Sequence, residues 1–151
     1  AAATAAATAG LLGVVAADGT RPPWPPETFD RVLVDAPCSG LGALRRRPEA
    51  RWRRSEADLD ALVPLQRALL GSALDSVRRG GVVVYATCTP VLAETAGVVS
   101  AVLAGRDDVR LEDAQPLVGL DDAAGPLPGT VQLWPHRHGT DAMFVAVLRR
   151  S

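Results

Sequence analysis

Two short segments of this chain join strand-forming residues to a cysteine, and they constrain its fold more than any other feature. The run RVLVDA (31–36) is rich in β-branched residues and leads into Cys38, and the run VVVYATC (82–88) ends at Cys88. Continuous apolar runs of this kind are typical of parallel strands that are covered on both faces. Parallel neighbours need a long crossover connection between them, usually a helix.

The segment between the two runs has the periodicity of such a helix. Its apolar residues recur at steps of three and four and form one face, made of Leu59, Leu62, Val63, Leu69, Leu70, Ala73, Leu74 and Val77. Ser55 is a candidate N-cap, Gly80-Gly81 is expected to end the helix, and Pro64 is expected to kink or restart it. Strand, helix and strand in this order predict the α/β class with a right-handed crossover.

The other elements are predicted from local patterns. They are a helix end at 1–12, a short buried strand at 12–19, a helix at 92–104, and two late strands at 130–134 and 142–149 that flank a turn. Glu94 lies early in the predicted helix 92–104, where its charge favours the helix dipole. We expect it to have a structural role only.

Composition restricts the classes of protein that remain. A chain of 151 residues with 48% hydrophobic residues is expected to fold as one globular domain or as part of one. No apolar run approaches 18 residues, so we expect no membrane partner, and the Ala/Thr-rich start lacks the basic region of a signal peptide. These features predict a cytoplasmic protein with reduced thiols.

The two cysteines are the first candidates for chemistry. Cys38 and Cys88 follow the carboxyl ends of two strands that we expect to be neighbours, which is where open α/β sheets bind ligands. We therefore expect both thiols to face one cleft. From the residues alone they could be buried small side chains, a disulfide, or a nucleophile with a helper thiol. With His136 and His138 they match no zinc spacing, so no metal site is predicted.

Three segments, in order, carry a resemblance to a known family. The stretches DAPCSGLGALRRRPEARWRR (35–54), LQRALLGSALDSVRRGGVVVYATCTP (65–90) and HGTDAMFVA (138–146) resemble the Sun/Fmu family of RNA 5-methylcytosine methyltransferases. The resemblance implies a Rossmann-like class I methyltransferase fold, of which 1–151 would be the C-terminal half, with a mostly parallel sheet and a late antiparallel hairpin. The family's Gly-rich cofactor loop and its N-terminal RNA-binding domain are absent from these residues.

The resemblance also implies a covalent mechanism. Cys88 would be the nucleophile that adds to C6 of cytosine, and Cys38 the second thiol that resolves the adduct. Asp35 would hydrogen-bond the N3/N4 edge of the base. The resemblance implies S-adenosylmethionine as cofactor, with Asp18, Asp35 and Pro37 as candidate contacts, Asp18 at the adenine. The Pro37 carbonyl is also expected to reach the exocyclic amine of the cytosine.

An arginine cluster is the candidate RNA contact. Six of the sixteen basic residues, all of them arginine, lie between positions 45 and 54, namely Arg45, Arg46, Arg47, Arg51, Arg53 and Arg54. Guanidinium groups suit phosphates, and Trp52 can stack or pack among them. A solvated basic face is the alternative explanation of this cluster.

The function expected from these features is methylation of cytosine C5 in 16S ribosomal RNA. Transfer RNA as the substrate, a non-catalytic RNA-binding module and a thiol redox protein are the alternatives. Because the cofactor loop is missing, we expect residues 1–151 alone to be inactive and to bind cofactor weakly. A severed sheet would also expose a strand edge that invites self-association.

Overall fold

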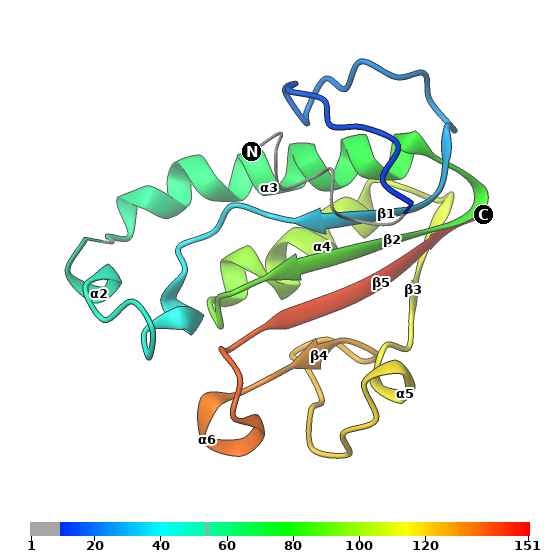
Figure 1. The fold of residues 1–151 in the computed structure, drawn as a ribbon. Helices are drawn as coiled ribbons and strands as arrows, with labels where there is room; N and C mark the ends of the chain where they lie inside the picture. The colour runs from blue at the N-terminus through cyan, green and yellow to red at the C-terminus, as the bar shows by residue number, and fades with distance from the viewer. Residues whose placement is uncertain (1–9, 54) are drawn as a thin grey trace.

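A computed structural model describes residues 10–53 and 55–151, which form one mixed sheet with helices packed mainly on one face (Figure 1). The strands are β1 (Phe29–Asp35), β2 (Val77–Thr87), β3 (Val109–Glu112), β4 (Val131–Gln132) and β5 (Phe144–Arg150). Their order is β1-β2-β5-β3, with β4 also paired to β5. β1 and β2 are parallel, and β5 runs antiparallel to β2, β3 and β4. The α/β class, the parallel pair and the late antiparallel pair are thus confirmed.

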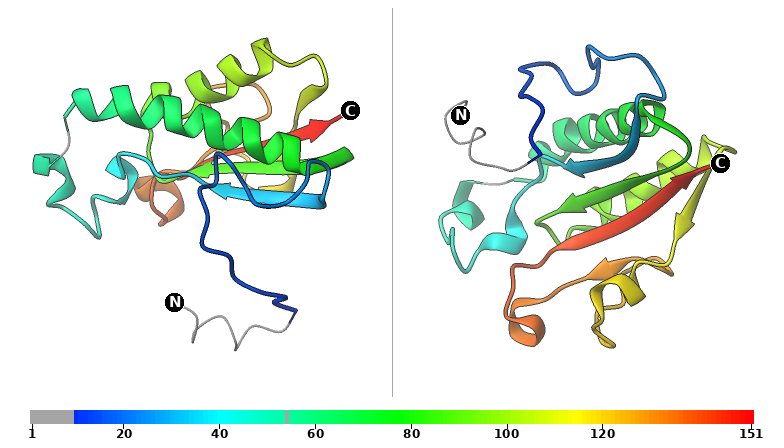
Figure 2. Two further views of the ribbon diagram at one scale, coloured as in Figure 1. Left: turned by 90° about the horizontal axis from the view of Figure 1, so that it is seen from above. Right: turned by 45° about the vertical axis from the view of Figure 1, so that its right-hand side comes forward.

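Two helices cover one face of the sheet. α3 (Ala57–Ser76) packs on β1 and β2, and α4 (Ala96–Ala104) packs beside it (Figure 2). The alternation of side chains along the strands selects which residues point at the helices. Val83 and Tyr85 of β2 meet Phe144 of β5 and Leu70 and Leu74 of α3 in the main buried cluster.

The opposite face of the sheet is only partly covered. Val147 of β5 packs on Ala123 and Val131 in a smaller cluster beneath the segment between β3 and β5. This cluster does not extend over β1, and Leu33 on this face of β1 is 68% exposed. The outer edge of β1 has no partner strand among the described residues.

The helix predicted between the cysteine segments is present, but it ends at Ser76, before the Gly80-Gly81 pair that was expected to end it. α3 runs without interruption through Pro64 to Ser76, and Val77 already belongs to β2. Gly80-Gly81 lies within β2, opposite a register shift in β1, where Gly80 takes a φ of 78°. Glycine adopts this left-handed conformation without strain, so the glycine pair forms an irregularity in the strand and does not end the helix.

The predicted buried strand at 12–19 is wrong. Residues 11–19 form no strand and are exposed, because no neighbouring strand among the described residues pairs with them. Of the predicted helix end at 1–12, residues 10–12 form a turn at Gly10 and no helix, and residues 1–9 lie outside the described part of the chain.

The remaining elements are short. The predicted helix at 92–104 is a 3-10 turn, η2 (Leu92–Glu94), followed by α4. β3 was not predicted, because four residues give too little alternation to be recognised. The other short helices are η1 (Leu41–Ala43), α2 (Ala50–Arg53), α5 (Gln115–Val118) and α6 (Pro135–His138). No helix within 10–53 and 55–151 has the length and apolar character needed to cross a membrane.

Replacement of Phe144 by alanine tests the main core. Its ring is fully buried and lies edge-on to Tyr85, with ring centroids 6.3 Å apart. Phe144→Ala should lower the free energy of unfolding by about 3–5 kcal/mol, because it removes apolar contacts and leaves a cavity. Leu33→Ala, on the open face, should change it by less than about 0.5 kcal/mol. Urea unfolding of both variants measures the difference, and equal effects would contradict this assignment of the core.

Candidate active site

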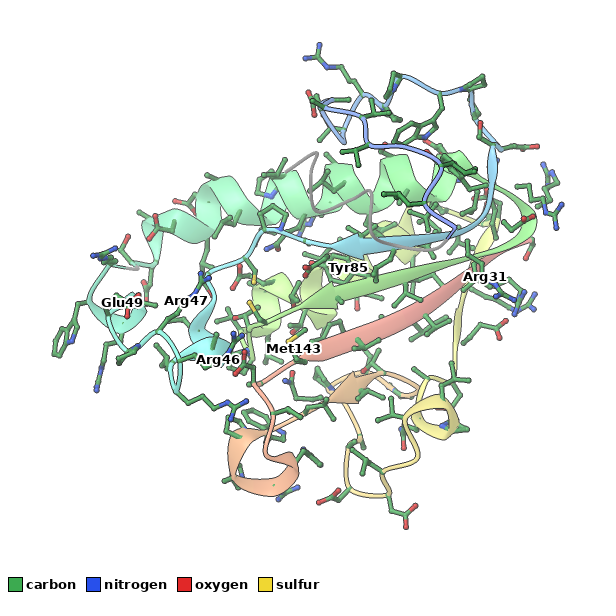
Figure 3. All side chains as sticks on the ribbon, viewed as in Figure 1. Arg31, Arg46, Arg47, Glu49, Tyr85 and Met143 are labelled. Carbon is green, nitrogen blue, oxygen red and sulfur yellow. The ribbon has the colours of Figure 1, made fainter. Side chains whose placement is uncertain are left out.

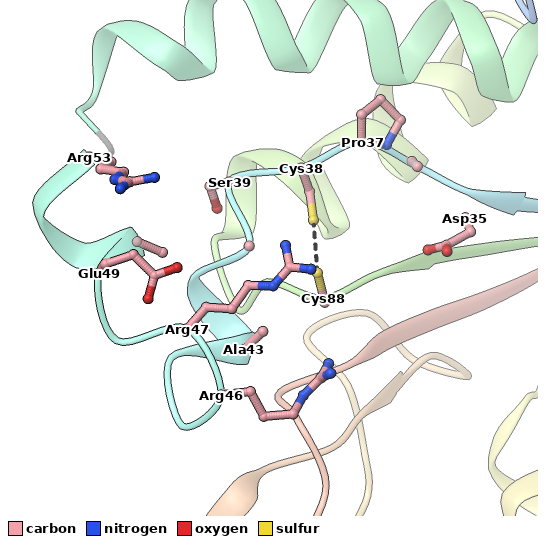
Figure 4. Close-up of a pocket in the computed structure, with 13 residues that line it drawn as sticks. Asp35, Pro37, Cys38, Ser39, Ala43, Arg46, Arg47, Glu49, Arg53 and Cys88 are labelled. Carbon is pink, nitrogen blue, oxygen red and sulfur yellow. Dashed lines mark hydrogen bonds between the residues drawn. The ribbon is translucent and has the colours of Figure 1, made fainter.

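The loops that follow β1 and β2 bring the two cysteines into contact. The Sγ atoms of Cys38 and Cys88 are 3.4 Å apart (Figure 4). The strand register causes this, since Asp35 pairs with Ala86 and the N–H of Ala36 donates to the Ala86 carbonyl at 3.0 Å. Parallel neighbours end at the same edge of the sheet, so both loops leave from one place. The predicted convergence of the two thiols is confirmed.

A glycine fixes how closely the first loop approaches the second. The N–H of Gly42 donates to the Cys88 carbonyl at 2.9 Å, and the Gly42 carbonyl accepts from the N–H of Ala142 at 2.9 Å. A Cβ at Gly42 would lie 2.8 Å from the Cys88 carbonyl oxygen, which is too close for any side chain. Gly42 therefore ties the Cys88 loop to the segment that enters β5.

Both sulfur atoms line a pocket of about 640 Å³. The lining also includes Asp35, Pro37, Ser39, Arg46, Arg47, Glu49 and Arg53. Figure 4 shows the side chains of Arg46, Arg47, Arg53 and Glu49 among the residues that line this pocket. In the wider view of Figure 3, Arg46 and Arg47 lie beyond the end of the sheet. The pocket thus combines two thiols, a carboxylate at a strand end and several cationic groups.

The two thiols are coupled through their contact. Burial, and after it the adjacent sulfur of Cys88, raises the pKa of the Cys38 thiol to about 12. Either sulfur can donate its S–H to the other across the contact. A thiolate is the nucleophilic form of cysteine, and two sulfur atoms this close disfavour ionisation of both at once.

The arginine cluster divides into two groups. Arg45 and Arg46 both bind the carboxylate of Asp141, with the Nε of each at 2.9 Å from a carboxylate oxygen. Arg46 also lines the pocket, together with Arg47 and Arg53. Asp141 is only 7% exposed and belongs to the late HGTD segment, so it anchors the arginine loop to the strand end near β5.

Arg51 lies at the surface beside an aromatic ring. The guanidinium of Arg51 lies over the ring of Trp52, 5.0 Å from its centre, and Trp52 is exposed. Cation–π contact of this kind orders both side chains on the surface. Arg54 lies outside the described residues.

Asp18 is hydrogen-bonded within its own turn, whereas Pro37 is hydrogen-bonded to a residue of α3. Asp18 Oδ1 accepts from the backbone N–H of Thr20 at 2.9 Å and from its hydroxyl at 2.7 Å, as in an aspartate turn. The Pro37 carbonyl accepts from Nε2 of Gln66 at 2.9 Å. Gly19 and Asp35 line a second pocket of about 290 Å³, whose other walls are largely apolar.

Sequence reasoning missed the role of Glu94. This side chain is fully buried beneath the two cysteine loops and does more than favour a helix dipole. It accepts hydrogen bonds from Ser39, Thr89 and Gln66. The only available signal in the sequence was an acidic residue six positions after a cysteine, and its partners are distant in the chain.

His138 holds the turn before β5. Its Nδ1 accepts from the backbone N–H of Trp134 at 2.8 Å, so in the neutral ring Nε2 carries the hydrogen and donates to Asp122 at 3.0 Å. This hydrogen bond lowers the pKa of the Asp122 carboxyl. His138 therefore stabilises the segment that presents Asp141.

A mixed α/β sheet with a thiol-lined pocket at the carboxyl ends of its parallel strands is typical of α/β proteins that bind ligands at this edge of the sheet. The sequence model described as "16S rRNA methyltransferase RsmB/F" matches residues 7–149. The chain belongs to this family, and its fold is the Rossmann-like fold of such methyltransferases.

Individual relatives agree with the family match. The chain is 62% identical over 127 residues to "Putative methyltransferase Rv1407" of Mycobacterium tuberculosis, with 81% of this chain and 26% of that protein covered. It is 39% identical over 128 residues to ribosomal RNA small subunit methyltransferase B of Vibrio cholerae, with 85% and 27% covered. The crystal structure of NSun6 from Pyrococcus horikoshii with SFG superposes with a TM-score of 0.66 and 33% identity, over 78% of this chain and 29% of that one. The chain spans about a quarter of the length of these curated relatives.

The contact between Asp141 and the arginine loop predicts a pH-dependent stability. Hydrogen bonds from Arg46 and then Arg45 lower the pKa of the Asp141 carboxyl from 3.8 to about 2. A lowered pKa stabilises the fold above the unfolded value and loses this effect as the pH falls through the folded value. The stability gap between the natural chain and Asp141→Asn should therefore be constant down to about pH 5 and close towards about pH 2. Urea unfolding across this range measures the gap, and a gap that persists at the acid end would contradict the assignment.

Proposed function

We propose that the intact protein is an RNA cytosine-C5 methyltransferase that acts on small-subunit ribosomal RNA in the cytoplasm and uses S-adenosylmethionine. Residues 1–151 form the C-terminal part of its catalytic domain. The observation that carries the proposal is the pair of sulfur atoms 3.4 Å apart, in a pocket that also holds the Asp35 carboxylate and cationic groups. Membership of the RsmB/F family supports the same substrate class.

The chemistry explains why a thiol is needed. C5 of cytosine is a poor nucleophile, and S-adenosylmethionine supplies an electrophilic methyl group when bound. Addition of the Cys88 thiolate to C6 would move electron density to C5, which would then take the methyl group as its bond to the cofactor sulfur breaks. Transfer of the C5 proton to a base would expel the Cys88 thiolate and restore the aromatic ring, so the enzyme ends unchanged.

Asp35 acts in the first step of this reaction and Cys38 in the last. Asp35 hydrogen-bonds the N3/N4 edge of the base and stabilises positive charge on the ring during addition, from its position at the end of β1. Cys38 is in contact with the Cys88 sulfur and assists release of the adduct. This division of roles follows the family motif that surrounds each cysteine.

The described residues fit one wall of a cofactor site. Asp35 lines both pockets, and the second one adjoins Gly19 and the apolar side chains of Leu33 and Leu69. An apolar wall with a carboxylate suits a nucleoside. We assign Asp18 to the adenine and Asp35 to the boundary between cofactor and cytosine. For Pro37, the remaining lone pair of the carbonyl is left for the ligand, since Gln66 uses the other.

The isolated chain should not be active, because one wall of a pocket gives few contacts. We expect residues 1–151 alone to bind S-adenosylmethionine weakly and to transfer no methyl group. Isothermal titration calorimetry of the isolated chain checks this. Tight binding at one site per chain would contradict the assignment of 1–151 to part of a domain.

Trapping with RNA that contains 5-fluorocytosine tests the nucleophile in the full-length protein. Fluorine at C5 cannot leave as a proton does, so a Cys88 adduct should accumulate and appear on a denaturing gel. Cys88→Ala should abolish the adduct, and Cys38→Ala should accumulate adduct even on ordinary RNA. An adduct that survives Cys88→Ala would overturn the assignment.

The same experiment separates the alternatives. A non-catalytic RNA-binding module predicts RNA affinity without any adduct in the natural protein. A thiol redox protein predicts no adduct and no RNA affinity. Trapping with transfer RNA in place of ribosomal RNA distinguishes the two substrates.

The division of the arginine cluster predicts unequal effects on RNA binding. Arg47→Ala and Arg53→Ala remove cationic groups that line the pocket, and each should weaken RNA binding by about 1 kcal/mol and reduce its salt dependence. Arg79→Ala removes the same charge from the opposite end of β2, where its guanidinium contacts the Ser151 carbonyl, and should have no such effect. Titrations at several salt concentrations measure this, and equal losses in all three variants would contradict a specific role of the pocket.

A further inference from the structure

A buried carboxylate lies under the two loops that carry the thiols, and no step of the chemistry above uses it. We propose that Glu94 is a positioning residue that sets the separation of the Cys38 and Cys88 sulfur atoms. The inference rests on the proposed function for its catalytic consequence, but the geometry on which it stands is independent of that function.

The first loop is held through the residue next to Cys38. The backbone N–H of Ser39 donates to Oε1 of Glu94 at 2.7 Å, and the Ser39 hydroxyl donates to Oε2 at 2.5 Å. Two bonds from one residue to both oxygens of one carboxylate fix the orientation of the loop as well as its distance.

The second loop is held through the residue next to Cys88. The hydroxyl of Thr89 donates to Oε2 of Glu94 at 3.0 Å, and the two hydroxyls of Ser39 and Thr89 lie 3.0 Å from each other. Each thiol is thus one residue away from a hydrogen bond to the same carboxylate. Cys38 and Cys88 lie 50 positions apart in the sequence. The side chain of Glu94 connects their two loops directly through hydrogen bonds.

The carboxylate itself is fixed from two sides. Nε2 of Gln66, on α3, donates to Oε1 of Glu94 at 3.0 Å and to the Pro37 carbonyl at 2.9 Å, and both partners are acceptors, which sets the orientation of the amide. The hydroxyl of Tyr85, on β2, donates to the backbone carbonyl of Glu94 at 2.8 Å. Glu94 therefore moves with the strand that leads into Cys88.

A carboxylate satisfies this whole set of partners. Its two oxygens accept from the Ser39 N–H, the Ser39 hydroxyl, the Thr89 hydroxyl and the Gln66 amide, and they need to donate nothing. A glutamine amide would keep an acceptor for the two N–H donors, but its NH2 group would require the Ser39 and Thr89 hydroxyls to turn and accept. Removal of the side chain would leave buried polar groups without partners, and the loops would shift to satisfy them. A displacement of about 1 Å at reacting groups can cost on the order of 100-fold in rate.

The distance between the two sulfurs can be measured without methyl transfer. Oxidised glutathione reacts with one thiolate to give a mixed disulfide and one glutathione thiolate, and the second cysteine then displaces the second glutathione as the Cys38–Cys88 disulfide forms. The equilibrium gives the effective concentration of one thiol at the other. In the full-length protein, the fraction of disulfide at equilibrium is measured from the amount of the peptide pair that contains Cys38 cross-linked to Cys88.

We expect Glu94→Ala to lower this effective concentration by about 10- to 100-fold and Glu94→Gln by less. Ser39→Ala and Thr89→Val each remove a single hydroxyl, fold more readily, and should give smaller losses in the same direction. Val99→Ala is the matched control, because it removes buried atoms from α4 in the main core without touching either loop. If Glu94→Ala matches Val99→Ala within about twofold, and the single-hydroxyl variants are unchanged, the proposal is wrong.

Kinetics supply the second readout. Glu94→Gln should lower kcat for RNA methylation and leave KM for RNA unchanged. A general loss of folded protein would only lower the concentration of active enzyme, and active-site titration corrects kcat for that loss. An unchanged kcat would overturn the proposal. If the natural protein forms no adduct, the proposed function fails, and the glutathione equilibrium still decides the role of Glu94.

Discussion

The parallel pairing of β1 with β2 is the constraint on which the rest of this structure depends. It aligns Asp35 with Ala86 and ends both strands at one edge, so that Cys38 and Cys88 leave the sheet side by side. Every other feature of the pocket follows from this edge. The covering helix α3 stabilises the pair by burying Leu70 and Leu74 against it, and the antiparallel β5 closes its other side. A register shift of one residue would reverse the faces of all these side chains.

Electrostatic contacts then decide how the loops around this edge are held. Asp141 is buried and binds Arg45 and Arg46, which fixes Arg46 in the wall of the pocket and ties both arginines to the frame of the site. Glu94 performs the same task beneath the thiols with neutral donors. Burial of a carboxylate is unfavourable unless its hydrogen bonds are complete. At both sites, a buried carboxylate accepts hydrogen bonds from residues that are distant in the sequence and so joins their segments.

The two faces of the sheet differ in a way that matches the partial domain we propose. The face under α3 and α4 is closed, whereas the open face of β1 exposes Leu33 and the outer edge of β1 has no partner strand among the described residues. The second pocket, lined by Gly19 and Asp35, lies along this same strand. This pocket and the unpaired edge of β1 fit the proposed assignment of the chain to part of a larger domain.

The sequence by itself determined the elements whose signals are local or periodic. The apolar runs at 31–36 and 82–88, the helical spacing between them and the position of each cysteine predicted the parallel pair and the convergence of the thiols, and the quoted motifs identified the family. The tertiary structure alone decided the rest. It placed 12–19 outside the sheet because a strand needs a neighbour, divided the arginines through Asp141, and assigned Glu94 to both loops. These outcomes depend on contacts between residues up to 96 positions apart, and no local pattern in a single sequence encodes which distant groups will meet.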